Sequence, residues 1–208
     1  LLLPDGPADE ARAQRCVLEG HAAFVAAQMR SIAPDDDPCT RFIRDAHARG
    51  GWPAVLRAVS SPPPSTEMNL HPNKLDVDFP VRVGLPEWEA AGAKLVRDDT
   101  LGELELRTLL EGRGWSADEA YVAATGWDGD RMQVYALADG TTLVLWRLLW
   151  DRELDGVQFR NALAPKKDAP AQRRGVRPGD RRAIDPHVAA VGVDQPIDRF
   201  QRRGLAGA

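Results

Sequence analysis

The sequence predicts an α+β fold, with N-terminal helices followed by a helix-flanked antiparallel β-hairpin or small sheet. In the first 60 residues, apolar positions recur with the period of a helix and are interrupted by proline and glycine. Further on, Asp139-Gly140 separates two stretches rich in strand-forming residues, which is a strong hairpin signal. Helical patterns on both sides of this hairpin complete the α+β pattern.

Residues 8–31 are predicted to form the first and longest helix. Leu18, Ala22, Val25 and Met29 recur at spacings of three and four, so they form one apolar stripe. A helix with one apolar stripe needs a partner to cover it, so the first 60 residues are expected to pack poorly alone. Two shorter helices are predicted to follow, at about 39–48 and 53–59, on either side of Gly50-Gly51.

The stretch PPPSTEMNLHP, residues 62–72, places Glu67 and His71 four positions apart. Side chains at this spacing meet on a helix, so the two could share a proton or ligate a metal together. The alternative is a one-turn helix that Ser65 caps and Pro72 ends, with Glu67 favouring its N-terminus and His71 its C-terminus. Local spacing leaves both interpretations open.

The rest of the chain predicts a small sheet among short helices. The strand at 141–150 is apolar on both faces, which is typical of a strand covered on both sides. Asp130 and Arg131, at the start of the preceding strand, are candidates for an ion pair. The remaining expected elements are extended segments at 79–83 and 94–97, helices at 100–111, 117–124 and 152–163, and a strand at 131–137.

Charge divides the chain into a body and a tail. Residues 165–208 carry ten Lys/Arg and five Asp/Glu, so the tail has a net charge of +5 and the body −9. We predict a helical segment at 1–78, an α+β subdomain at 79–164 and a disordered basic tail. The overall charge of −4 argues against a nucleic-acid partner, and no apolar run reaches the roughly 18 residues of a membrane span.

No complete catalytic apparatus can be assembled from this sequence, so no catalytic residue is assigned. It contains no HExxH motif, phosphate-binding loop or GxSxG motif. Glu19 lies on a helix rich in small residues, which indicates that its carboxylate faces a neighbouring helix or a metal. The alternative is a carboxylate that is solvated or paired on the helix surface. Cys16 and Cys39 form one disulfide or remain two thiols.

Several stretches together resemble a family of uncharacterised bacterial zinc metallopeptidases with an HExxH, gluzincin-like site. The resemblance runs from about residue 15 to 163, and many members are exported or lipid-anchored. The matching stretches are LEGHA at 18–22, GGWPAV at 50–55, PSTE at 64–67 with LHP at 70–72, DTLGE at 99–103, AATGWDGDR at 123–131, and Trp150-Asp151 followed by Phe159.

The resemblance implies a zinc site completed by a region that this chain lacks. In the family, an HExxH helix supplies two histidine ligands and the general base, and a later glutamate is the third ligand. By resemblance that role falls on Glu19, while Glu67 and His71 line the cleft. Zinc is implied for the full-length parent and no cofactor for this chain alone.

Three functions follow from these observations. In the first, the chain is the C-terminal fragment of a zinc-metallopeptidase-like protein and is inactive alone. Its partners are then a peptide substrate or the missing N-terminal HExxH region. The second is a degenerate, non-enzymatic binding or scaffold domain of the cell envelope. The third, a basic-tailed nucleic-acid adaptor, is the weakest because the body is acidic. The resemblance implies a periplasmic or cell-envelope location, with the signal region outside this chain.

Overall fold

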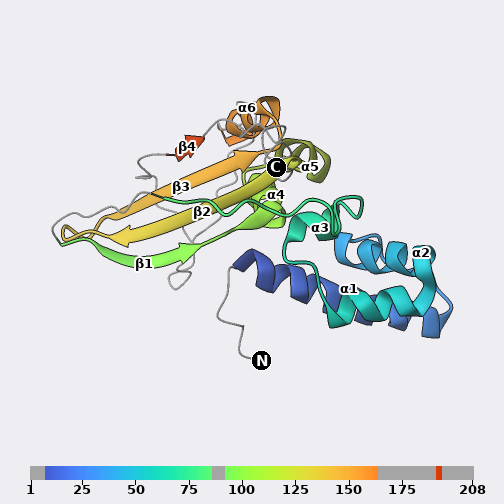
Figure 1. The fold of residues 1–208 in the computed structure, drawn as a ribbon. Coiled ribbons are helices and arrows are strands. Elements are labelled where there is room, and N and C mark those ends of the chain that lie inside the picture. Colours follow the sequence, from blue (N-terminus) through green and yellow to red (C-terminus); the bar gives the residue numbers. More distant parts are fainter. Residues whose placement is uncertain (1–7, 86–91, 164–190, 194–208) are drawn as a thin grey trace, which may run out of the picture. The chain divides into compact units, whose positions relative to one another are not determined.

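A computed structural model describes residues 8–85, 92–163 and 191–193 (Figure 1). The chain forms two compact units. Unit 1 comprises residues 1–81 and 100–105, and unit 2 comprises residues 82–99 and 106–208. Helices at the N-terminus precede an antiparallel sheet with further helices, so the predicted α+β class is confirmed. The predicted domain boundaries stay a prediction, because most of the tail lies outside the described residues.

Unit 1 is built on two long helices, α1 (Ala8–Arg30) and α2 (Pro38–Ser60). Asp37 caps α2, since its carboxylate accepts hydrogen bonds from two backbone N–H groups of the first turn. The two short helices predicted from the sequence are present as the two arms of α2, which are separated where Gly50 and Gly51 have non-helical dihedrals. The kink lies at Gly50-Gly51, where Gly51 has φ +60° and ψ −160°, a conformation that is nearly restricted to glycine.

A small apolar core and a disulfide hold α1 against α2. Cys16 and Cys39 are bonded, with their Cα atoms 4.9 Å apart, which decides between the two alternatives left open by the sequence. One turn further along α1, a Cβ on Gly20 would lie 2.2 Å from the carbonyl oxygen of Cys39, so only glycine fits there. The buried apolar side chains of this core are Val17, Phe24, Phe42, Ile43, Ala46 and Val55.

The one-turn helix predicted in PPPSTEMNLHP is present as α3 (Thr66–Leu70). The Ser65 side chain accepts a hydrogen bond from the Met68 N–H and caps the helix. At the other end, the His71 N–H donates to the Glu67 carbonyl. Local capping chemistry therefore sets both ends of α3.

Unit 2 contains a four-stranded sheet in the order β1-β2-β3-β4. Strands β2 (Trp127–Ala136) and β3 (Thr142–Trp150) form an antiparallel hairpin, and β1 (Lys94–Asp99) pairs antiparallel with β2. Within the predicted tail, β4 (Val191–Val193) pairs parallel with β3. The predicted extended segment at 79–83 is not a strand.

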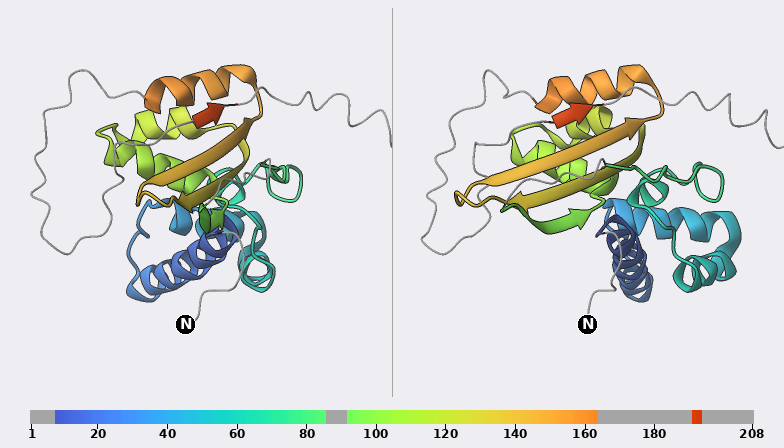
Figure 2. Two further views of the ribbon diagram at one scale, coloured as in Figure 1. Left: turned by 90° about the vertical axis from the view of Figure 1, so that its left-hand side faces the viewer. Right: turned by 60° about the vertical axis from the view of Figure 1, so that its left-hand side comes forward.

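The helices associated with the sheet are α4 (Gly102–Gly112), α5 (Ala117–Ala124) and α6 (Glu153–Leu163). The first turn of α4 belongs to unit 1. Helices α5 and α6 lie against one face of the sheet (Figure 2). There the ring of Phe159 contacts Trp150 and Trp146, with ring centroids 5.0 and 6.3 Å apart.

The predicted pairing of Asp130 with Arg131 is wrong. These neighbours on a strand point to opposite faces of the sheet. Asp130 is buried and accepts hydrogen bonds from the indole N–H groups of Trp127 and Trp146, at 3.1 and 3.0 Å. Arg131 instead forms an ion pair with Asp98 of β1 at 2.6 Å.

Candidate functional site

Three buried carboxylates lie in unit 1 around α3. Asp9, Glu67 and Glu103 are 2%, 1% and 0% exposed. A buried carboxylate is costly unless it is hydrogen-bonded or paired, so the partners of these groups decide what the cluster does.

Asp9, in the first turn of α1, binds the start of α3. Its carboxylate accepts hydrogen bonds from the Thr66 backbone N–H at 3.1 Å and from the Thr66 hydroxyl at 2.5 Å. The Asp9 N–H donates to the Thr100 carbonyl, and the Leu104 N–H donates to the Thr66 hydroxyl oxygen. The position of Asp9 near a helix N-terminus also favours its negative charge.

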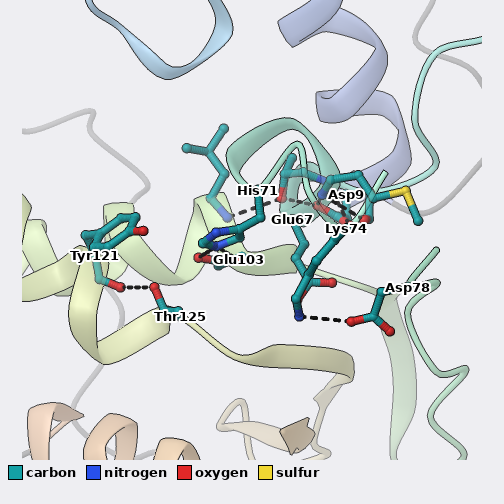
Figure 3. A network of polar contacts seen from close by, with 12 residues as sticks. Asp9, Glu67, His71, Lys74, Asp78, Glu103, Tyr121 and Thr125 are labelled. Atoms are coloured by element: carbon teal, nitrogen blue, oxygen red, sulfur yellow. Dashed lines mark hydrogen bonds and ion pairs between the residues drawn. The ribbon is translucent and has the colours of Figure 1, made fainter. Parts of the chain in front are cut away.

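Two further pairs complete this network (Figure 3). The His71 Nε2 lies 2.9 and 3.0 Å from the two carboxylate oxygens of Glu103, and the His71 side chain is 13% exposed. The Lys74 ammonium lies 2.5 Å from Glu67 Oε1 and 3.1 Å from a carboxylate oxygen of Asp78. Each buried carboxylate of unit 1 therefore has a charged or hydrogen-bonding partner.

The network joins segments that are far apart in the sequence. It links the start of α1, the region 65–78 and the segment 100–105, all within unit 1. Glu67 and His71, the two predicted cleft residues, both belong to it, but through different partners. A histidine paired with a carboxylate can exchange a proton, and the same pairs also fix the chain in place. Their assignment to a substrate cleft stays a prediction.

Asn69 lies on α3 beside this network, but within the described ranges its buried side chain has no partner comparable to those of the three carboxylates. Its side chain is 2% exposed, and neither its amide nitrogen nor its amide oxygen has a hydrogen-bond partner among the described residues. It borders a hollow of about 20 Å³, which is room for one water molecule. The other residues lining the hollow are Pro38, Arg41, Phe42, Asp45, Leu70 and Pro72.

Glu19, the predicted third zinc ligand, is exposed on α1. In the part of the chain that the structure describes, no group of three metal-ligating side chains includes it. The zinc assignment of Glu19 stays a prediction that rested on the family resemblance alone.

The apolar stripe identified in the sequence faces solvent. Leu18 and Met29 are 52% and 82% exposed, and Ala22 between them is exposed as well. The buried side chains of α1 lie on the other side of the helix, against α2. Helix α1 is thus apolar on two opposite faces, of which α2 covers one.

Charged residues lie along one flank of this stripe. Glu19 and Arg30 are separated by three helical turns and point in nearly the same direction. Neither of them forms an ion pair with any residue that the structure describes. Just beyond the helix, Ile32 is a further exposed apolar side chain, at 57%.

An aromatic cluster that the sequence analysis did not identify borders the other flank. Trp52 is 44% exposed, and its ring centroid lies 6.5 Å from His21, 5.1 Å from His47 and 6.0 Å from Phe24. The kink at Gly50-Gly51 places this tryptophan against α1. The signal in the sequence was GGWP, where two glycines precede a tryptophan and a proline.

Comparisons with known proteins give two partial matches. A family model described as a domain of unknown function (DUF8575) matches residues 92–194, just under half of the chain. Autophagy-related protein 17 of Sclerotinia sclerotiorum is 46% identical over 50 residues, which are 24% of this chain and 10% of that protein. The chain thus matches only about a tenth of the length of this relative. No solved structure matches.

These findings contradict the predicted resemblance to bacterial zinc metallopeptidases. The matches are to a domain of unknown function and to a fungal autophagy-related protein, and neither points to a metallopeptidase, a hydrolase or a cell-envelope scaffold. The short stretches that carried the resemblance are mostly turns, caps and glycines, and such signals recur for local structural reasons. Among the described residues, no helix is long and apolar enough to cross a membrane.

Proposed function

We propose that unit 1 is a protein-interaction module that binds an apolar helix through the stripe Leu18, Ala22, Val25 and Met29 of α1, hereafter the α1 stripe. The observation that carries this proposal is the exposure of Met29 and Leu18, at 82% and 52%, on one continuous face. Large apolar side chains in a row on a surface are typical of interaction sites, whereas isolated ones are ordinary.

A helix is the partner that best fits the shape of this surface. Helix α1 is regular over 23 residues and contains no proline, so the stripe is straight. The small side chain of Ala22 lies between the larger ones, so the ridges of a second helix can enter the surface there. The exposed Trp52 at its border is of the residue type most enriched at binding sites.

The proposal is tested by titration with a defined probe. The probe is a fluorescein-labelled, 21-residue amphipathic peptide of Ala, Leu, Lys and Glu, with leucines at positions i, i+4, i+7 and i+11. We expect fluorescence anisotropy to show saturable binding with a micromolar dissociation constant. In the double variant Leu18→Glu, Met29→Glu, binding should weaken at least tenfold, because both large contacts are lost.

The matched control is Leu154→Glu in unit 2. Leu154 is 63% exposed on α6 and is not part of the α1 stripe, so this variant should bind the peptide like the unmodified protein. Equal loss of binding in both variants, or no binding at all, would overturn the proposed function.

A further inference from the structure

We propose that the α1 stripe pairs with the same stripe of a second copy of this chain, with the two α1 helices antiparallel. The twofold axis lies between Phe24 and Val25. This inference rests on the proposed function, because it names the occupant of the same surface.

Charge complementarity along the flank of the stripe selects this arrangement. Eleven residues turn an α-helix by three turns and about 20°, so Glu19 and Arg30 lie on the same flank, about 17 Å apart. When two copies of α1 lie antiparallel, the same flank of each copy meets. Glu19 then faces Arg30 of the second copy, and the twofold axis repeats this ion pair.

The same register matches the remaining side chains. His21 faces Gln28 of the second copy, which is a hydrogen-bonding pair. Val25 lies next to the axis and packs against Val25 of the second copy. Leu18 lies near Met29 and Ile32 of the second copy. A parallel pair would instead bring the flank with Glu19 and Arg30 against the opposite flank, with His21 and Gln28, so neither ion pair could form.

The contact is short, so the dimer is expected to be weak. From Leu18 to Met29 the stripe is about 17 Å long, or three helical turns. Such a contact is smaller than that of most permanent dimers, and the expected dissociation constant is micromolar or weaker.

The test is sedimentation equilibrium of the full chain from 1 to about 500 μM, with three charge variants. Glu19→Arg and Arg30→Glu each create two like-charge contacts, so each should weaken the dimer about tenfold. The double variant Glu19→Arg, Arg30→Glu has the composition of the unmodified protein and restores both ion pairs, so its dimer constant should return to within about threefold of the original.

Each outcome separates this inference from the proposed function. A chain that stays monomeric at every concentration overturns the inference, and the proposed function survives if the peptide still binds. Loss of both dimer and peptide binding overturns both. A dimer that forms but does not respond to the charge variants, or that the double variant fails to restore, overturns the antiparallel arrangement.

Discussion

At the scale of single residues, most buried polar side chains that the structure describes are hydrogen-bonded, and Asn69 is one of the exceptions. Its amide lies beside the well-bonded pairs of Asp9 with Thr66 and of His71 with Glu103. A buried polar group without a partner costs about 1–3 kcal/mol. The neighbouring polar groups are well hydrogen-bonded, so we expect the unpaired amide of Asn69 to lower the stability of this part of unit 1.

Replacing Asn69 with leucine should leave stability unchanged or raise it, by up to about 2 kcal/mol, because the unpaired amide is removed at nearly constant volume. Urea denaturation measures the free energy of unfolding. The control is Thr66→Val, which removes a hydroxyl bonded to buried Asp9 and should destabilise by about 2–3 kcal/mol. If Asn69→Leu destabilises as much as the control, the amide has a partner, such as a water molecule in the hollow.

The pKa of the Asp98 carboxyl lies below its ordinary value of 3.8, mainly because the Arg131 guanidinium donates hydrogen bonds to it. A hydrogen bond from Gln133 makes a smaller contribution. A depressed folded-state pKa stabilises the fold above pH 3.8, and this stabilisation is lost as the pH falls through the folded-state pKa. We expect Arg131→Met to raise the Asp98 pKa more than Gln133→Leu does. Carbon-detected NMR titration of the carboxyl measures both. Equal shifts in the two variants would contradict this ranking.

At the scale of elements, the close approach of α1 and α2 depends on Gly20 and the neighbouring disulfide. Cys16 joined to Cys39 keeps the α2 backbone from moving away, so a larger side chain at position 20 cannot be accommodated by a shift of α2. The bond joins two positions that are 23 apart in the sequence, which corresponds to about 3 kcal/mol in the chain-entropy description.

Gly20→Ala should therefore destabilise the protein by about 3 kcal/mol, because the new Cβ meets the Cys39 carbonyl. Gly112→Ala is the matched control, since a Cβ on Gly112 in α4 meets nothing within 4 Å. That substitution should be neutral or stabilise by up to about 1 kcal/mol. Thermal and urea denaturation compare the two variants. A Gly20→Ala variant as stable as Gly112→Ala would show that α1 and α2 can separate without cost.

Elements set by local chemistry could be predicted from the sequence, and long-range contacts could not. The caps of α3 and the Asp139-Gly140 hairpin depend on a few adjacent residues, and both were found. The contact of His71 with Glu103 joins positions 32 apart, and no spacing rule indicates it. The break between the helices predicted at 39–48 and 53–59 also depends on adjacent residues, and it is present at Gly50-Gly51 within α2.

The α1 stripe shows most clearly what a sequence pattern cannot decide. Its spacing predicted the helix and the need for a partner, but not which apolar face α2 would cover. Both faces of α1 are apolar, and the disulfide at Cys16 together with Gly20 fixes the buried one. The pattern also could not identify what covers the other face.

At the scale of the whole molecule, the two units have different characters. Unit 1 is helical, has a small core and a disulfide, and exposes the α1 stripe. Unit 2 contains the sheet, whose aromatic side chains pack with α6. Disulfides persist in oxidising compartments, so we expect the chain to work in one. The periplasmic or cell-envelope location stays a prediction.

The oxidation rate of Met29 tests most directly whether the α1 stripe is a docking surface. Met29 is 82% exposed and Met68 is fully buried, so dilute peroxide should oxidise Met29 quickly and Met68 slowly, as mass spectrometry of digested protein measures. Saturating amphipathic peptide should slow the oxidation of Met29 severalfold and leave Met68 unchanged. An oxidation rate of Met29 that stays the same while the peptide is bound would contradict the central claim, because the peptide would then occupy another surface.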